Sequence, residues 1–321
     1  MTDVSRRTVL ASAAGTAALG LTGNLAFLPA AEAADLRKTG HYSYKIGDIE
    51  VISIYDGVWQ NSGFDQISVG VSGEDVKAAL KAAGQTTDYI PIEFAFTVVK
   101  SGGKTILIDA GTGGQLAPTA GLAARGGFAA AGITPDTVDT VLVSHMHPDH
   151  IFGLMENDTN AQVYPNAEIL VNEAEYAFWT DPSIIESLPE RRKGLAKRIQ
   201  ATFPKWENVS QFTGDSEVAP GIRAVNSFGH APGHTNFHIS SGNDQMMLIG
   251  DAIIVPALFL ANLDWQLAFD ADKDKATATR KAIVAQAIAD DMTIGGYHFG
   301  FPNAGKIVKD GAGHAFVPAS V

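Results

Sequence analysis

The stretch that decides the fold is Ser144-His145-Met146-His147-Pro148-Asp149-His150, which directly follows an apolar segment predicted as a strand at 140–143. In an extended chain, residues two positions apart point to the same side, so His145 and His147 are predicted to face one point. A turn at Pro148 would then bring Asp149 and His150 to a second point. Imidazole nitrogens and carboxylate oxygens are ordinary ligands of zinc and similar divalent ions. We therefore interpret the stretch as a metal-binding motif rather than as a charged surface turn.

Further along the chain, a histidine or an aspartate stands next to a predicted strand in three segments. These are Pro232-Gly233-His234-Thr235, Ile249-Gly250-Asp251 and Gly296-Tyr297-His298-Phe299. Each is weak evidence alone, because a single histidine is more often a satisfied core or surface group. With the first stretch they give five histidines and two aspartates, a set that suits two metal ions sharing one carboxylate. The remaining histidines are interpreted as lying outside the site, and His230 is the nearest of them to being included; they are His41, His230, His238 and His314.

The composition of the 321-residue chain favours a folded globular protein, because 45% of the residues are hydrophobic and the 33 Gly and 14 Pro follow no repeat. The net charge of −12 speaks against a nucleic-acid partner, since an acidic protein gains nothing from counterion release at phosphates. The chain has no cysteine, which excludes disulfides and leaves histidine and carboxylate side chains as metal ligands.

Residues 1–33 are interpreted as a twin-arginine-type export signal. Arg6 and Arg7 precede a mildly hydrophobic stretch at 9–28, and Ala31-Glu32-Ala33 is typical of a cleavage site. An ordinary secretory signal or an uncleaved anchor is the alternative. The signal predicts a periplasmic or secreted protein with no stable membrane association once it is removed, and a single domain over residues 34–321.

Within that domain, strands are predicted at 50–55, 94–100, 105–108 and 140–143, with a Gly102-Gly103 hairpin turn between the second and third. Helices are predicted at 116–131, 172–179, 183–203 and, with a clear amphipathic pattern, 273–289. Further strands are expected at 222–225, 236–240, 245–249, 306–308 and 314–317. This order fits an α/β domain made of two halves, each with a sheet and helices.

The combined pattern H-x-H-x-D-H, P-G-H-T, G-D and a late histidine resembles the metallo-β-lactamase superfamily across residues 43–318. Segments 106–150, 178–179, 229–235 and 251–318 resemble its methyl parathion hydrolase branch. The resemblance implies a four-layer αββα sandwich with two metal ions at one edge of the two sheets. It also implies that His145, His147 and His234 hold one ion, that Asp149, His150 and His298 hold the other, and that Asp251 bridges them.

These observations predict a dinuclear metal-dependent hydrolase of hydrophobic neutral esters, with Asp149 and Asp251 as candidate catalytic residues. A hydroxide that bridges the two ions would attack a lactone, an aryl ester or an organophosphate triester, and Asp149 would orient it or carry its proton. Asp109 is a candidate for holding a ligating histidine in place. Leu116 stands where parathion hydrolases have an aromatic residue, which shifts weight toward lactones and aryl esters. The candidate substrate contacts are Leu116, Phe178, Trp179 and Phe299.

Zinc is the favoured metal, although the same ligands also accept manganese, iron or cobalt. An iron-dependent redox enzyme on the same fold, a β-lactamase and a non-catalytic binding module are the alternatives. Di-iron redox relatives usually carry a glutamate where His147 stands, and a binding module would not require a bridging Asp251. The expected partner is a small hydrophobic substrate, and the sequence is compatible with a homodimer.

Overall fold

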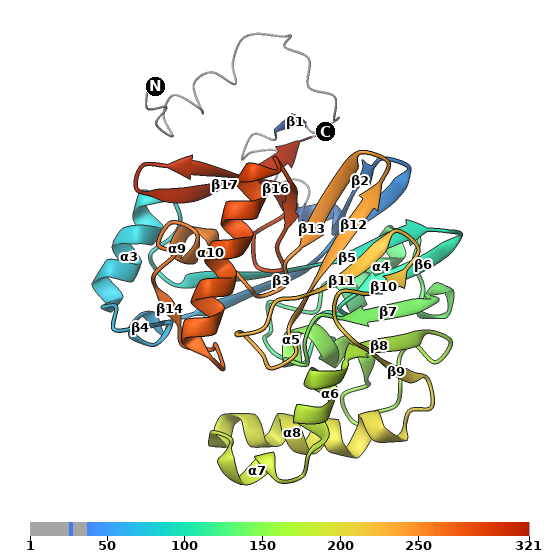
Figure 1. Ribbon diagram of the computed structural model, residues 1–321. Coiled ribbons are helices and arrows are strands. Elements are labelled where there is room, and N and C mark those ends of the chain that lie inside the picture. Colours follow the sequence, from blue (N-terminus) through green and yellow to red (C-terminus); the bar gives the residue numbers. More distant parts are fainter. Residues whose placement is uncertain (1–25, 28–36, 321) are drawn as a thin grey trace.

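The computed structural model describes residues 26–27 and 37–320, which form two large β-sheets packed face to face with helices outside them (Figure 1). Most of the predicted export signal, residues 1–33, lies outside the described residues; only residues 26–27 fall within them. In the described part of the chain, every helix is too short or too polar to cross a membrane.

The first sheet has seven strands in the order β2-β3-β5-β6-β7-β8-β9. Strands β2, β3, β5 and β6 are antiparallel neighbours, whereas β6, β7, β8 and β9 run parallel. The predicted hairpin between β5 and β6 is present, and its turn uses positive φ values of 57° and 75° at Gly102 and Gly103, which glycine adopts without strain. The strands are β2 (His41–Ile46), β3 (Ile49–Asn61), β5 (Ile90–Ser101), β6 (Lys104–Ile108), β7 (Thr140–Val143), β8 (Glu168–Asn172) and β9 (Val209–Phe212).

The second sheet has eight strands in the order β1-β17-β16-β15-β13-β12-β11-β10. Neighbouring strands in this sheet are antiparallel except β13 and β15. These two are parallel because helix α10 (Lys273–Ala289) lies in the connection between them. The strands are β1 (Ala26–Phe27), β10 (Glu217–Ala219), β11 (Ile222–Asn226), β12 (Thr235–Ser241), β13 (Asp244–Leu248), β15 (Thr293–Gly295), β16 (Ala304–Asp310) and β17 (Gly313–Ser320). A two-stranded ribbon pairs β4 (Ser68–Val69) with β14 (Gln266–Leu267).

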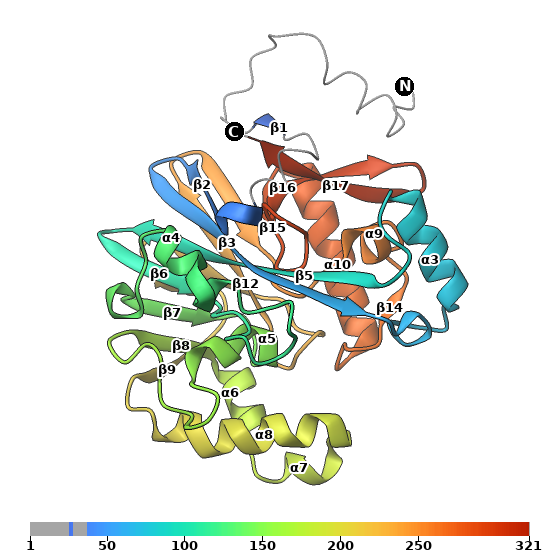
Figure 2. The same cartoon turned by 180° about the vertical axis from the view of Figure 1, so that it is seen from behind.

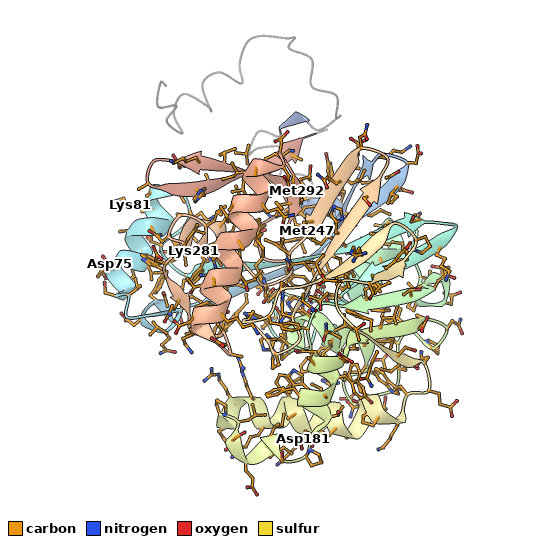
Figure 3. All side chains as sticks on the ribbon, in the orientation of Figure 1. Asp75, Lys81, Asp181, Met247, Lys281 and Met292 are labelled. Carbon is orange, nitrogen blue, oxygen red and sulfur yellow. The ribbon has the colours of Figure 1, made fainter. Side chains whose placement is uncertain are left out.

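A hydrophobic layer fills the space between the two sheets, where side chains such as Val51, Ile106 and Phe237 are buried. Helix α10 covers the outer face of the eight-stranded sheet, and Met247 and Met292 lie in the layer beneath it (Figure 3). On the other side of the molecule, α6 (Glu173–Thr180) contacts strands β8 and β9, and α8 (Glu190–Thr202) packs on α6 (Figure 2). The predicted four-layer αββα sandwich is therefore confirmed.

The predicted helix at 116–131 is wrong. Only one irregular turn (Ala123–Gly127) and α4 (Phe128–Ala130) are helical there, because Gly126 adopts a φ of 149° that an α-helix cannot contain. The predicted helix at 183–203 is divided before Pro189 into α7 (Ile184–Ser187) and α8. Helix α10 begins and ends as predicted, whereas α3 (Gly73–Ala82) was not predicted. The remaining short helices are α5 (Pro148–Ile151) and α9 (Pro256–Phe259).

Candidate metal centre

The first group of candidate ligands comes directly after the carboxyl end of β7, an interior strand of the seven-stranded sheet. His147 is extended, with φ −76° and ψ 157°, and Pro148 then begins α5. Proline suits the first position of a helix because the amide hydrogen that it lacks would have no partner there. The switch from extended chain to helix turns Asp149 and His150 away from His147, so one short sequence supplies ligands to two points, as the spacing predicts.

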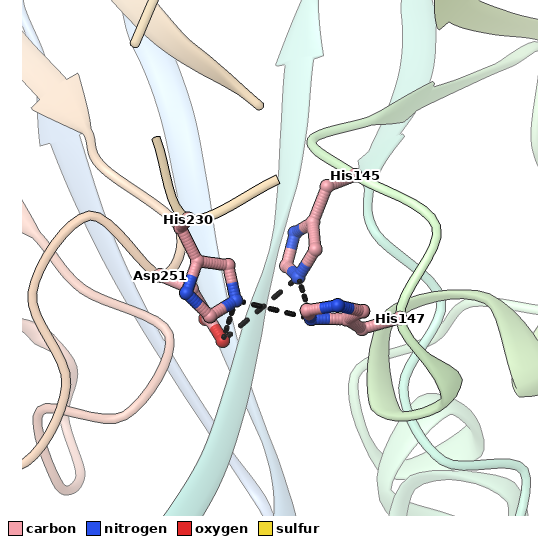
Figure 4. Close-up of side chains that lie close together, drawn as sticks. All are labelled: His145, His147, His230 and Asp251. Atoms are coloured by element: carbon pink, nitrogen blue, oxygen red, sulfur yellow. Dashed lines mark hydrogen bonds and ion pairs between the residues drawn. The ribbon is translucent and has the colours of Figure 1, made fainter. Parts of the chain in front are cut away.

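Three imidazoles and one carboxylate meet at the first point (Figure 4). The Nδ1 atom of His147 lies 2.8 Å from Nε2 of His145 and 3.0 Å from Nε2 of His230. The Oδ2 atom of Asp251 lies 3.4 Å from Nε2 of His230 and 3.9 Å from Nε2 of His145. All four side chains are buried. Three imidazole nitrogens and one carboxylate oxygen are a donor set that fits a tetrahedral divalent ion.

The second point gathers Asp149, His150, His298 and the other oxygen of Asp251. Asp251 Oδ1 lies 3.2 Å from Nε2 of His150 and 3.2 Å from Nε2 of His298. Asp149 Oδ2 lies 3.4 Å and 3.3 Å from the same two nitrogens. Despite these short distances, Nε2 of His150 and Oδ1 of Asp251 make no hydrogen bond with any described residue, and both atoms are buried. Such atoms are costly unless something else binds them, and a metal ion fits both.

Asp251 belongs to both clusters: Oδ2 contacts the histidines of the first and also lies 3.2 Å from Nε2 of His298, whereas Oδ1 contacts only the second. It lies just after β13, which ends at Leu248, and it donates its backbone N–H to Nε2 of His234, 3.0 Å away. This geometry corrects the prediction for His234. The Nδ1 atom of His234 lies 2.6 Å from Oγ of Ser227, so both of its ring nitrogens are used inside the protein. His234 therefore holds the backbone of Asp251 and lies outside the first cluster. His230 occupies the ligand position that the family resemblance implies for His234.

The ring nitrogens that point away from the clusters are held by fixed acceptors. Nδ1 of His150 lies 2.8 Å from Asp109 Oδ2, so the contact predicted for Asp109 is present. Nδ1 of His298 lies 2.8 Å from the carbonyl oxygen of Glu93 on β5. Nδ1 of His230 lies 2.8 Å from Asp270 Oδ1. Each contact places the proton on Nδ1 and leaves Nε2 free as a metal ligand.

Two buried side chains that sequence analysis missed support this arrangement from behind. Arg280 of α10 is fully buried and donates to Asp270 Oδ2 at 3.3 Å, and also to the backbone oxygens of Ala252 and Trp265. The carboxylate of Glu175 on α6 accepts the backbone N–H groups of Met146 and Gly233, at 2.9 and 2.8 Å. Burial raises the pKa of Glu175, and these donors oppose that shift. Glu175 thus ties the loop of His145 and His147 to the loop that carries His230.

The two clusters differ in electrostatics. Burial and the neighbouring imidazoles lower the pKa values of His145 and His147 well below the usual histidine value, so both rings are neutral and ready to bind a cation. Burial acts in the same direction at His150 and His298. There, however, the carboxylates outweigh burial, with Asp251 the largest contributor, and they raise the pKa, to about 9 at His298. An ion that binds the second cluster must therefore displace protons.

A pocket of about 410 Å³ opens onto both clusters, and its wall is mostly apolar. Leu116 lies in this wall as predicted and is 42% exposed. Trp179 does not: it is 1% exposed and donates its indole N–H to Glu175 Oε1 at 2.8 Å. Phe178 and Phe299 are also absent from the wall, because Phe178 packs edge-on against Trp179 and Phe299 against Phe316. The wall residues that the sequence did not reveal are Trp59, Ile92, Phe94, Ala117, Leu195, Ile254 and Phe269.

Two facing sheets, helices on both outer faces and a His/Asp centre at the strand ends together define the class of this protein. The chain belongs to the metallo-beta-lactamase superfamily, whose sequence pattern matches residues 95–298. The predicted superfamily is thereby confirmed, and the match supports the predicted class of enzyme, a metal-dependent hydrolase.

Two solved structures and one curated protein show which members of the superfamily this chain resembles. The solved structure of AidC, described as a dizinc quorum-quenching lactonase in complex with a product, is 26% identical, with a TM-score of 0.78; the alignment covers 88% of this chain and 98% of that one. The hydrolase AbOPH of the beta-lactamase superfamily shares the fold, with a TM-score of 0.80, 24% identity and coverage of 88% and 98%. A curated N-acyl homoserine lactonase of Bacillus cereus is 26% identical over 118 residues, which span 37% of this chain and 39% of that protein.

Proposed function

We propose that this protein hydrolyses lactones at a dinuclear zinc centre and that its substrates are N-acyl homoserine lactones. The observation that carries the proposal is the shared Asp251, which joins two ligand clusters at the base of an apolar pocket. The similarity to AidC and to the curated lactonase supports the substrate class. The net charge of −12 also suits a neutral substrate better than an anionic one.

In this proposal, one ion is held by His145, His147 and His230, and the other by Asp149, His150 and His298, with Asp251 between them. When bound, the two ions supply Lewis acidity and lower the pKa of water toward neutrality. His230 thus replaces His234 in the predicted ligand set. The wall that includes Phe94 and Leu195 receives the acyl chain, while the lactone ring lies over the clusters.

Asp149 is the residue that moves protons in this proposal. Its carboxylate lines the pocket and is 17% exposed, whereas that of Asp251 is 7% exposed. Burial alone would raise the pKa of Asp149, but the neighbouring His150 and His298 outweigh burial and hold this pKa well below its usual value. An ionised carboxylate at this place can orient the attacking water, accept its proton on Oδ1, the oxygen not used toward His150 and His298, and return it to the departing alkoxide oxygen.

The test is hydrolysis by zinc-loaded protein of an N-acyl homoserine lactone, an aryl ester and a phosphotriester, each with and without a chelator. We expect the lactone to have the highest kcat/KM, with turnover lost in chelator and restored by zinc. A higher kcat/KM for the aryl ester or the phosphotriester would overturn the substrate class. If zinc-loaded protein turns over none of the three, the hydrolase proposal fails, and the iron redox alternative should be examined by metal analysis.

A matched pair of variants separates the site from the rest of the molecule. Asp251→Asn should abolish turnover and lower zinc content, because both clusters lose their shared oxygen donor. Asp264→Asn removes a carboxylate that is 86% exposed and pairs with Lys281, so its activity should match that of the wild type. Full turnover by Asp251→Asn would contradict the dinuclear arrangement.

A further inference from the structure

Two adjacent arginines belong to the lining of the pocket. Arg191 and Arg192 are in the first turn of α8, directly after Glu190, and both line the pocket. The N-terminus of a helix carries partial positive charge, so cations are unfavourable there, and two neighbouring guanidinium groups also repel each other. Local rules of sequence are broken most often where function requires it. The position therefore calls for an explanation other than stability.

Arg192 is the better placed of the two. Its guanidinium is partly buried and donates to the backbone oxygen of Phe269 at 2.7 Å, the single hydrogen bond of that group to another described residue. Burial lowers the pKa of Arg192, so the fold stabilises its charge only weakly. A guanidinium has five N–H donors in a planar fork, and those not used by Phe269 are available to a ligand in the pocket.

The location of this cation is fixed from two sides. Arg192 lines the same pocket as His147 and His230 of the first ligand cluster. Phe269, which it holds, stacks on Trp59 with ring centroids 6.2 Å apart, and both rings belong to the apolar wall. Arg192 thus stands at the junction between the metal ligands and the apolar wall. In a ligand that spans the pocket, the group that joins the reactive end to the hydrophobic tail would lie beside Arg192.

We propose that Arg192 donates a hydrogen bond to the amide carbonyl oxygen of an N-acyl homoserine lactone and so selects acylated amino lactones over simple alkyl lactones. This inference rests on the proposed lactonase function. In such a substrate the amide joins the ring to the acyl chain, so with the ring over the clusters and the chain against the wall, its carbonyl lies at the junction. A simple alkyl lactone places only methylene groups there, and the guanidinium then loses hydration without gaining an acceptor.

The experiment compares kcat/KM of zinc-loaded wild type, Arg192→Met and Lys197→Met on two substrates. One is an N-acyl homoserine lactone, and the other is an alkyl lactone of equal chain length without the amide. Methionine retains most of the apolar stem of arginine and removes every donor. Lys197→Met is the matched control, because it removes the same charge from an exposed residue of the same helix that does not line the pocket.

For Arg192→Met we expect kcat/KM on the amide substrate to fall by about tenfold or more, the usual effect of losing a charged hydrogen bond. On the alkyl lactone the change in kcat/KM should stay within about threefold, as should the change on either substrate with Lys197→Met. Equal losses on both substrates would overturn the inference, because they would mean that Arg192 acts only by holding Phe269. The absence of any loss would overturn it as well. Failure of wild type to hydrolyse either lactone would overturn the proposed function itself.

A second variant and a second measurement guard against misfolding of Arg192→Met. Arg192→Lys keeps one donor for Phe269 but loses the planar fork, so it should show the same preference in weaker form. Calorimetric binding of the ring-opened N-acyl homoserine, which retains the amide, should weaken by about tenfold in Arg192→Met. Unchanged binding of this product would also overturn the inference.

Discussion

Replacing Asp270 by alanine should separate two roles that one buried carboxylate combines. Oδ1 of Asp270 holds Nδ1 of His230 at 2.8 Å, and Oδ2 accepts from Arg280 at 3.3 Å. The side chains of Asp270 and Arg280 are both fully buried, and that of His230 is 2% exposed. Loss of a carboxylate that orients a ligating histidine lowers metal affinity by about 10–100-fold, so Asp270→Ala should weaken zinc binding by that factor.

The same substitution leaves Arg280 without its carboxylate. Breaking a buried ion pair costs about 3–5 kcal/mol. Arg280 keeps two backbone acceptors, at 3.2 Å in Ala252 and 2.8 Å in Trp265, so we expect a loss near the lower limit, about 3 kcal/mol in the free energy of unfolding of the apoprotein. Urea unfolding in the presence of chelator measures this loss, and competition with a chromophoric chelator measures zinc affinity.

The double variant Asp270→Ala with Arg280→Met supplies the control. Because an apolar pair often replaces a buried ion pair without loss, the double variant should regain most of the stability. It should not regain zinc affinity, since His230 still lacks its acceptor. Two results would refute the orienting role of Asp270: recovery of zinc affinity in the double variant, or a decrease in zinc affinity of less than about twofold in the single variant.

Three other predictions follow from the site. His230→Ala should reduce bound zinc from two ions to one per chain, whereas His234→Ala should retain two and mainly lower the melting temperature; elemental analysis of dialysed protein decides between them. Zinc affinity should fall below pH 9, because the carboxylates raise the pKa of His298 to about 9 against the effect of burial, and the proton on His298 then competes with the ion. The fall in affinity should be about tenfold per pH unit for each proton displaced. Zinc titration at several pH values measures it, and an affinity that does not change with pH would contradict the prediction. Leu116→Trp should lower kcat/KM for long acyl chains more than for short ones, since Leu116 lies in the pocket wall, and equal effects would remove it from the acyl path.

Sequence reasoning succeeded where a few neighbouring residues settle the geometry. The stretch 145–150 specifies its own shape, because an extended segment followed by proline permits little else. It failed at His230 and His234, which lie four residues apart in one loop. The path of that loop depends on distant contacts: Glu175 accepts the backbone N–H of Gly233, and the backbone N–H of Ala271 donates to the backbone oxygen of His230. A P-G-H-T pattern by itself does not reveal which histidine faces the clusters.

The pocket wall could not be read from the sequence for a related reason. It combines residues from β3, β5, α8 and the loop before α10, which are far apart along the chain. The sequence predicts Trp179 as a wall residue because it ends a predicted helix next to Asp181-Pro182. Its indole instead completes the buried hydrogen bonds of Glu175, a partner that no local pattern identifies. The export signal, the cellular location and a homodimer stay predictions.

The ligand clusters draw on both sheets at once: the stretch 145–150 follows β7, whereas Asp251 and His298 follow strands of the opposite sheet. Ions that bind only the native chain shift the folding equilibrium by mass action, by about 2.7 kcal/mol for each ion present at a hundred times its dissociation constant. Zinc supply would then govern how long the chain survives proteases as well as how fast it turns over substrate. In a zinc-poor medium, loss of activity would be accompanied by loss of the protein itself.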